Sequence, residues 1–392
     1  MESHPRIPGS RGPSAAARRR IALLATLALA AQARADLWET PGWALLGTAT
    51  AKAGYDSNLT FSRDGQGDAF GTAEADLLLE RMNSLALTEF TATAAETDFA
   101  SHRAPAQLDA SASARVRYPS EQDELARFSA AASWTRVTAA DPELNRRLTL
   151  EKTLADVGGR VVTSGQFGLD ADVGYQLYDY SADGLGRNHQ TDLKVGLAYD
   201  PSPLTEISAN LAGGLGATSG NASVPSSTDR SETATVQIEG QILPKLTSTL
   251  YAGVTHISYS GGYSHASTLP TSGGQLVWDM APGKSLRGGV SLTNGFAPDG
   301  ETQRKSEASL DYRQALSRIW AAEVLLEASR YSDRNNSFTR TDTSESAGAA
   351  LSYTPSHRFK VSLGYSILHQ TSDLQEAGFA RHLVTLQVDL HI

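Results

Sequence analysis

The stretch LDASASARVRY at residues 108–118 decides the fold class, because apolar and polar residues alternate along it without a break. A period of two residues is that of a β-strand, whose side chains point alternately to opposite faces. The stretch is longer than the roughly five or six residues usual in soluble sheets. It has the length of a tilted strand that crosses a bilayer. The sequence therefore predicts a transmembrane strand with one apolar and one polar face.

The same alternation recurs along the chain and is clearest at its end. It is present at residues 234–239 and 307–312, and at residues 384–392, which read VTLQVDLHI. Large aromatic residues lie near the ends of such stretches or on their apolar positions, as the interfacial girdles of a membrane protein require. These residues are Trp43, Tyr118, Trp134, Tyr175, Tyr199, Trp278, Tyr312, Trp320 and Tyr365.

Turn signals divide the chain into hairpins. Short breaks fall at residues 81–84, 118–120, 163–165, 200–203, 243–245, 281–284, 316–318 and 354–357, roughly every 40 residues. Longer breaks rich in Gly, Asp, Ser and Asn lie between them, for example at residues 63–67, 217–230 and 334–337. Short turns on one side and longer loops on the other are typical of outer-membrane barrels.

We therefore expect an all-β fold, a transmembrane antiparallel up-and-down β-barrel over residues 43–392. The turns predict about 18 strands, with both ends of the barrel segment in the periplasm. Sixteen strands is the alternative, because residues 85–100 and 147–160 alternate poorly.

The N-terminal segment resembles a secretory leader. Arg18, Arg19 and Arg20 precede an apolar run from Ile21 to Ala30, and Ala33-Arg34-Ala35 places small residues where signal peptidase cleaves. A membrane-spanning helix would need about 20 apolar residues, so residues 1–35 are predicted to be a signal peptide cleaved near Ala35. Residues 36–42 then form a short periplasmic segment before the barrel.

Composition narrows the function. The formal net charge is −9, and loss of the Arg-rich leader makes the remaining chain more acidic, so a general nucleic-acid binder is not expected. The sequence has no cysteine, which excludes disulfides, thiolate metal sites and cysteine catalysis. A mean hydropathy of −0.29 also suits a soluble all-β protein. A wide barrel shows the same average because half of each strand faces water.

No motif points to catalysis. The sequence lacks a Gly-x-Ser-x-Gly elbow, a phosphate-binding loop and a His-Glu-x-x-His motif. The nearest approach, residues 262–266, lacks the final glycine, and Asp389 with His391 reads as a polar pair on the water-facing side. We expect no enzyme activity, no cofactor and no metal site.

The polar positions of the strands predict a charged lumen in which acids outnumber bases. The candidate lumen-facing residues are Glu74, Asp76, Asp109, Arg115, Arg117, Asp170, Asp172, Lys194, Glu239, Arg287, Glu307, Asp311, Arg313, Glu323, Glu327 and Asp389. The same pattern also places Glu151 and Arg127 at polar positions. An open bore of this composition would attract cations; internally paired charges that fill the bore are the alternative.

A local motif suggests a family. The residues Gly54, Tyr55, Asp56, Asn58 and Leu59 form a Gly-Tyr-Asp-x-Asn-Leu sequence in the first expected strand. In this motif, and in its serial hairpins with Pro-containing turns, the chain resembles the β-barrel porin family found beside exopolysaccharide loci of Gram-negative bacteria. The resemblance implies an outer-membrane location and a role in polysaccharide export or anchoring. It implies no catalytic residues.

Two functions remain open at this stage. The first is a porin-like channel for exopolysaccharide export or solute passage. The second is a non-conducting barrel that is structural or binds an envelope partner. The longest break, residues 217–230, is short for a folded plug, which favours the channel. The expected partners are outer-membrane lipid and lipopolysaccharide, the barrel-assembly machinery and polysaccharide-export proteins, with no nucleic acid.

Overall fold

A computed structural model describes most of the chain from residue 38 onward. The described residues are 38–40, 42–59, 61–63, 65–83, 85–101, 104–119, 125–141, 146–180, 187–219, 226–260, 265–296, 302–334, 339–373 and 378–391. The predicted signal peptide and the last residue, Ile392, lie outside them. No helix in these ranges has the length and hydropathy to span a bilayer.

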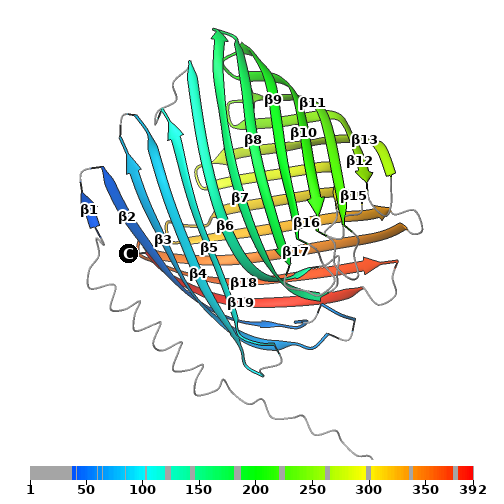
Figure 1. The fold of residues 1–392 in the computed structure, drawn as a ribbon. Helices are drawn as coiled ribbons and strands as arrows, with labels where there is room; N and C mark the ends of the chain where they lie inside the picture. The colour runs from blue at the N-terminus through cyan, green and yellow to red at the C-terminus, as the bar shows by residue number, and fades with distance from the viewer. Residues whose placement is uncertain are drawn as a thin grey trace, which may run out of the picture.

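Eighteen antiparallel strands, β2 to β19, form one closed barrel, so the predicted strand count is confirmed (Figure 1). The strands are β2 (Trp43–Asp56), β3 (Asp68–Met82), β4 (Leu87–Phe99), β5 (Gln107–Tyr118), β6 (Ala126–Asp141), β7 (Arg146–Ser164), β8 (Phe167–Tyr180), β9 (Asn188–Ser202), β10 (Thr205–Thr218), β11 (Ser227–Leu243), β12 (Leu246–Ser260), β13 (His265–Ala281), β14 (Lys284–Phe296), β15 (Thr302–Ala315), β16 (Trp320–Arg334), β17 (Thr339–Ser356), β18 (Phe359–Ser372) and β19 (Phe379–His391). The two poorly alternating stretches form β4 and β7, which rules out the sixteen-stranded alternative.

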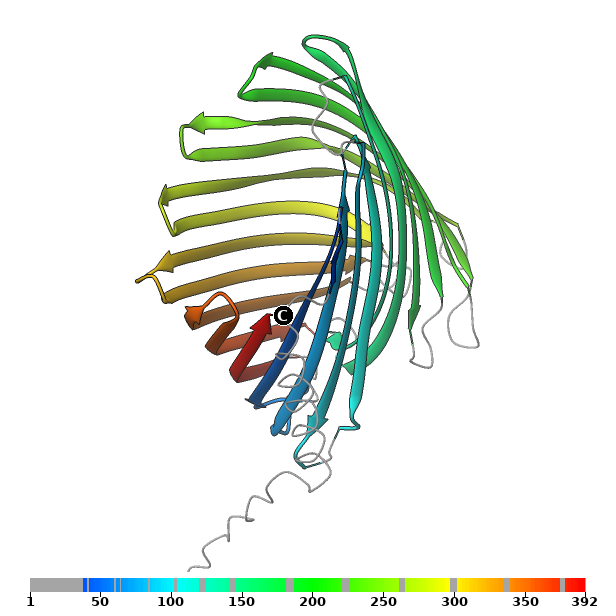
Figure 2. The ribbon, with the colours of Figure 1, turned by 90° about the vertical axis from the view of Figure 1, so that its left-hand side faces the viewer.

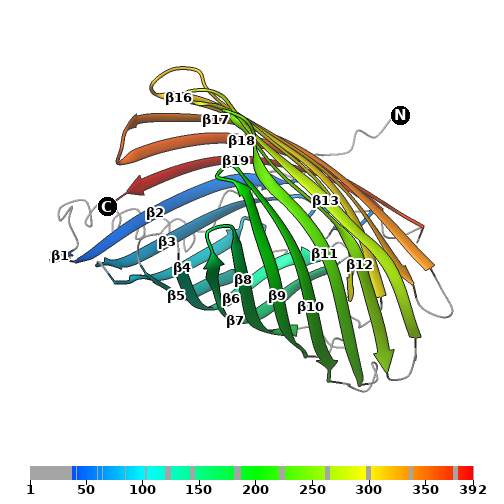
Figure 3. The same ribbon diagram turned by 90° about the horizontal axis from the view of Figure 1, so that it is seen from above.

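The barrel closes between its last and first strands. β19 pairs with β2 from Leu383 opposite Asp56 to His391 opposite Thr48, so every strand from β2 to β19 has two neighbours. Figure 3, seen from above, shows the wall that these strands form. Closure satisfies the backbone hydrogen bonds of all strands, which is the condition for a sheet to cross a bilayer.

A short additional strand lies beside the closing pair. β1 (Trp38–Thr40) folds back on the start of β2, with Trp38 opposite Leu45 and Thr40 opposite Trp43. Gly42 has φ of 89°, a backbone conformation that glycine adopts without strain, and it forms the turn between them. β1 thus covers the part of the β2 edge that lies beyond the end of β19 (Figure 1).

Tight turns lie at one end of the barrel and longer connections at the other (Figure 2). We call these the turn end and the loop end. The connections at the turn end fall at the eight predicted breaks. Five of them have two residues each, at residues 165–166, 203–204, 244–245, 282–283 and 357–358, and the longest spans residues 119–125. The N-terminal β1 and the end of β19 also lie at the turn end.

The outer surface is apolar, with aromatic residues toward the turn end. Phe167 stacks on Tyr199 with 4.9 Å between ring centroids, and the Trp320 and Tyr353 rings lie 4.8 Å apart. The Arg81 guanidinium lies 5.2 Å from the centre of the Trp43 ring. Exposed aliphatic side chains follow along the strands, among them Leu193, Leu211, Leu250, Val290 and Leu386. An aromatic girdle beside an aliphatic band is the lipid-facing surface of a membrane barrel.

Candidate functional site

Strand register separates the side chains into two continuous faces. The outer face carries the exposed aliphatic and aromatic residues, and the other face carries most of the charges. Side chains converge only on the concave side of a curved sheet. The contacts of Arg160 identify that side, because this one residue of β7 reaches carboxylates on β8, β9 and β10. We therefore interpret the charged face as the inner face of the barrel.

Arg160 is the centre of the largest ion-pair cluster among the described residues. Its Nη1 lies 2.7 Å from Glu206, its Nη2 lies 3.4 Å from Asp200 and its Nε lies 3.8 Å from Asp170. Gly168 allows this arrangement, because a Cβ there would lie 2.9 Å from the Arg160 Nε. The cluster holds the guanidinium near the turn end, with only 15% of the side chain exposed.

The register places the sixteen predicted lumen charges on the same face as Arg160. The strand pairs concerned place Glu74 and Asp76 beside Thr50 and Thr48, and Asp172 opposite Lys194. They also place Arg287 opposite Asp311, and Glu323 opposite Arg313. The strand pairs place the other predicted lumen charges on this face as well. These charges come from strands all around the barrel, so they line a bore and do not form one compact centre.

Glu151 is an exception, and its assignment to the polar face was wrong. It pairs with Arg136 on the outer face, and the two side chains lie 3.7 Å apart at the loop end of β6 and β7. The inner positions of the same segment include Leu150 and Leu154. The hydrophobic alternation inverts where β7 approaches the loop end, and sequence pattern alone therefore misassigns the face.

Many inner charges remain in contact with solvent. Arg115, Lys194, Glu239, Arg287 and Glu327 are exposed although they point into the barrel. Buried apolar side chains are few in the described chain: Leu59, Phe61, Phe99, Leu148, Ala198, Ile257 and Phe379. The interior is thus lined by water-accessible polar groups and is not packed as a hydrophobic core.

Bases on the inner face are more often neutralised than acids. Lys305 lies 2.9 Å from Glu307, and Arg313 contacts both Asp311 at 3.2 Å and Glu323 at 2.9 Å. In the described ranges, several inner acids form no ion pair; these are Asp172, Asp192, Asp229 and Glu239. The unpaired charge of the bore is therefore mainly negative.

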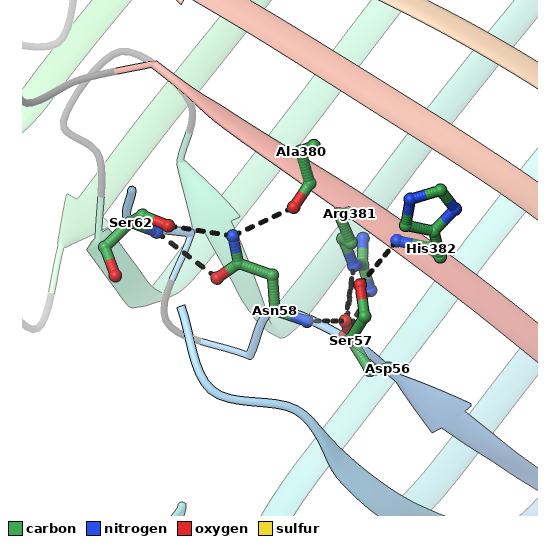
Figure 4. A network of polar contacts seen from close by, with 7 residues as sticks. All are labelled: Asp56, Ser57, Asn58, Ser62, Ala380, Arg381 and His382. Carbon is green, nitrogen blue, oxygen red and sulfur yellow. Dashed lines mark hydrogen bonds and ion pairs between the residues drawn. The ribbon is translucent and has the colours of Figure 1, made fainter. Parts of the chain in front are cut away.

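The motif at residues 54–59 builds the loop-end seam between β2 and β19 (Figure 4). Asp56 is 2% exposed and accepts hydrogen bonds from the Nε of Arg381 at 3.0 Å and from its Nη2 at 2.7 Å. Asn58 donates from Nδ2 to the carbonyl oxygens of Ser62 at 2.9 Å and Ala380 at 3.1 Å. These contacts tie the first loop to β19, so the motif residues have a structural role in closing the barrel.

The motif glycine and the first loop complete this seam. A Cβ on Gly54 would lie 2.7 Å from the Phe70 ring, so glycine is needed for that ring to lie across β2. In the loop, Phe61 packs edge-on against Phe379 with 5.3 Å between centroids, and the Arg381 guanidinium lies 4.7 Å from the Phe61 ring centre. Leu59 is 4% exposed beside them. Tyr55 points to the outer face and is 51% exposed.

Sequence reasoning missed several inner bases that the fold brings into contact with acids. Arg160, Lys305, Arg340 and Arg381 were not assigned to the lumen, yet each forms an ion pair there. The sequence does contain a signal for these bases. Since alternate residues of a strand lie on the same face, counting positions back from a turn assigns each residue to a face. Counting from the break at residues 163–165 places Arg160 on the face of Asp156 and Lys152.

The described residues contain no group of three or more His, Asp or Glu side chains that could hold a metal ion. Asp389 accepts hydrogen bonds from the Thr50 hydroxyl at 2.9 Å and from the Gln387 amide at 2.7 Å. His391 lies next to Thr48, with 3.1 Å between Nδ1 and the hydroxyl oxygen. The pair considered in the sequence is thus embedded in wall contacts at the closing strands.

The comparisons with known proteins find similarity in structure, at low sequence identity. The sequence matches no protein-family model and no curated protein sequence. The structure is similar to OccK1 (OpdK) of Pseudomonas aeruginosa, with 11% identity, a TM-score of 0.47, and coverage of 88% of this chain and 99% of that one. It is also similar to the siderophore receptor PirA of Pseudomonas aeruginosa, with 10% identity, a TM-score of 0.46, and coverage of 89% and 80%. The alcaligin receptor FauA of Bordetella pertussis shows 10% identity, a TM-score of 0.43, and coverage of 89% and 76%. These similarities assign no substrate to this chain.

Proposed function

We propose that this chain is an outer-membrane channel with a water-filled, cation-preferring lumen. The observation that carries the proposal is the set of charged inner side chains that remain exposed to solvent, because a filled barrel would bury them. The closed sheet and the apolar outer band support a location in the outer membrane, reached after cleavage of the leader near Ala35. Lipopolysaccharide and the barrel-assembly machinery would then be its partners in the envelope.

The charge of the bore limits the cargo. Unpaired acids on an enclosed wall attract cations and repel anions. Small cationic or neutral solutes therefore suit the lumen better than a strongly anionic polymer. Exopolysaccharide export, with polysaccharide-export proteins as partners, is supported by the resemblance carried by residues 54–59. The acidic wall makes a neutral or basic polymer the better candidate for that role.

Ion selectivity tests this function directly. In planar-bilayer recordings under a salt gradient, we expect a reversal potential of the cation-selective sign that weakens as salt rises, because ions screen the wall charges. The triple variant Asp172→Asn, Glu239→Gln, Glu327→Gln should lower the selectivity. The matched outer-face variant Glu151→Gln, Glu232→Gln, Glu345→Gln should leave it unchanged. Anion selectivity would contradict the assignment of the inner face, and absence of conductance would favour a closed structural barrel.

The orientation of the barrel gives a second test. Short turns of outer-membrane barrels face the periplasm, so we expect a tag within residues 217–230 to be reached by antibody on intact cells. A tag at Pro201, at the turn end, should be reached only after the outer membrane is broken. Labelling in the reverse pattern would show that the barrel is inserted the other way.

A further inference from the structure

Three inner arginines lie side by side near the turn end of the barrel. Arg115 and Arg117 occupy successive inner positions of β5, so their Cα atoms are separated by about 7 Å along the strand. Arg127 of β6 lies diagonally across from Arg117, which pairs with Ser129. Such diagonal neighbours are roughly 7 to 8 Å apart and within reach of long side chains. Arg127 in turn pairs with Arg160 of β7.

The neighbouring acids leave this arginine cluster, Arg115, Arg117 and Arg127, largely unneutralised. Glu89 of β4 faces Arg115, and its carboxylate lies 3.8 Å from the Nη2 of Arg117, whose side chain is 52% exposed. Arg115 and Arg127 form no ion pair among the described residues. Asp156 shares the row of Arg115 but lies two strands away, beyond Ala131. Among the residues that the structure describes here, one carboxylate thus serves three guanidinium groups.

Arg160, in contrast to the arginine cluster, is neutralised by several acids. It occupies the position next to Arg127, yet it is held by Glu206, Asp200 and Asp170 on its other side. The cluster therefore gains no acid from β7, and the like charges of Arg127 and Arg160 stand opposite each other. Such a pair destabilises a sheet.

The wall beside the cluster leaves room for a ligand. The inner residues opposite Arg115 and Arg117 are Ala131 and Ser129, whose short side chains do not fill the space in front of the wall. Arg115, Arg117 and Arg127 are all exposed to the lumen. Guanidinium groups donate two parallel hydrogen bonds to carboxylate or phosphate oxygens, which gives such a group both charge and geometry to bind.

We propose that Arg115, Arg117 and Arg127 form an anion-binding site of the lumen that takes the carboxylate or phosphate group of a small solute. This proposal rests on one part of the proposed function, namely that the lumen is filled with water. In a bore whose unpaired charges are mainly negative, the site holds a solute by its anionic group while the acidic walls face its cationic or hydroxyl groups. The bound anion supplies a negative charge that the described residues do not place there.

Calorimetric titration of the purified barrel in detergent tests the site without relying on conductance. Pyrophosphate and succinate are the two probes, and a difference between them identifies the preferred group. The variant Arg115→Gln, Arg117→Gln, Arg127→Gln should weaken binding by at least about tenfold, because each lost charge-assisted hydrogen bond changes affinity by about that factor. The outer-face variant Arg136→Gln, Arg304→Gln, Arg330→Gln removes the same charge and should bind as the wild type does.

The outcomes separate this site from the channel. Wild-type protein that binds neither anion, or equal losses in the two variants, would overturn the site, since the effect would then be absent or due to net charge alone. Heat-modifiable migration of each variant in a gel confirms that it has folded. A barrel that binds anions but does not conduct contradicts the channel only. A barrel that conducts but binds neither anion contradicts the arginine site only.

Discussion

Replacement of Arg381 by alanine is expected to lower the free energy of unfolding by about 3 kcal/mol, the lower part of the range for breaking a buried ion pair. The variant leaves Asp56, which is 2% exposed, without its cation at the seam between β2 and β19. The lower figure applies because the Arg381 side chain itself is 26% exposed. Urea unfolding of the purified barrel, followed by gel mobility, measures the loss.

Two variants control this prediction. The double variant Asp56→Asn, Arg381→Gln removes both charges and should recover much of the loss, because no uncompensated carboxylate remains. Arg230→Ala breaks the outer-face ion pair between Arg230 and Glu232. The side chain of Arg230 is 63% exposed and that of Glu232 is 51% exposed. That change should cost less than about 1 kcal/mol. Equal losses in Arg381→Ala and Arg230→Ala would show that the seam contact does not stabilise the barrel.

Leu386→Arg is expected to impair assembly of the barrel. Leu386 is 50% exposed on the outer face of β19, between Leu363 of β18 and Ala53 of β2. An arginine at a lipid-facing position costs roughly 2 to 4 kcal/mol near the bilayer midplane. Less folded protein should therefore reach the outer membrane, as measured by the heat-modifiable band in membrane fractions.

The adjacent residue supplies the matched control. Gln387 lies on the inner face, opposite Lys52 and Ser362, and its amide donates to Asp389. Gln387→Arg introduces the same side chain into a water-accessible wall beside a carboxylate, so assembly should be close to that of the wild type. If both variants assembled equally poorly, the outer and inner faces of β19 would be assigned wrongly.

The strand count followed from local chemistry. Most connections at the turn end are short, and each predicted break there contains Pro, Gly, Asn or Ser, so the sequence indicates the hairpin boundaries. Alternation was sharp where Leu or Val faced lipid, as in β19. It was weak in β4, whose outer positions include Ala92, Ala94, Glu96 and Asp98. Small or charged outer residues near the loop end blur the pattern without preventing the strand.

The ion-pair clusters could not be predicted in the same way. Arg160 and Glu206 are separated by three connections, and they meet only because the registers of β7 to β10 align them. Register depends on backbone pairing around the whole barrel, which a single sequence does not specify. The motif at residues 54–59 was visible as a pattern, but its partner Arg381 lies far along the chain and became evident only when β19 closed on β2.

The position of β1 indicates that the chain could be circularly permuted. Because it pairs with β2 at the turn end, residue 38 stands near the end of β19, which pairs with β2 as far as Thr48. A short flexible linker could therefore join the two ends of the described chain without crossing the bore. New ends could then be opened in a loop-end connection, such as the one between β10 and β11. Such a circular permutant would place the cut on the opposite side of the membrane while keeping every strand pair, because the up-and-down order of the strands is unchanged by where the ring is opened.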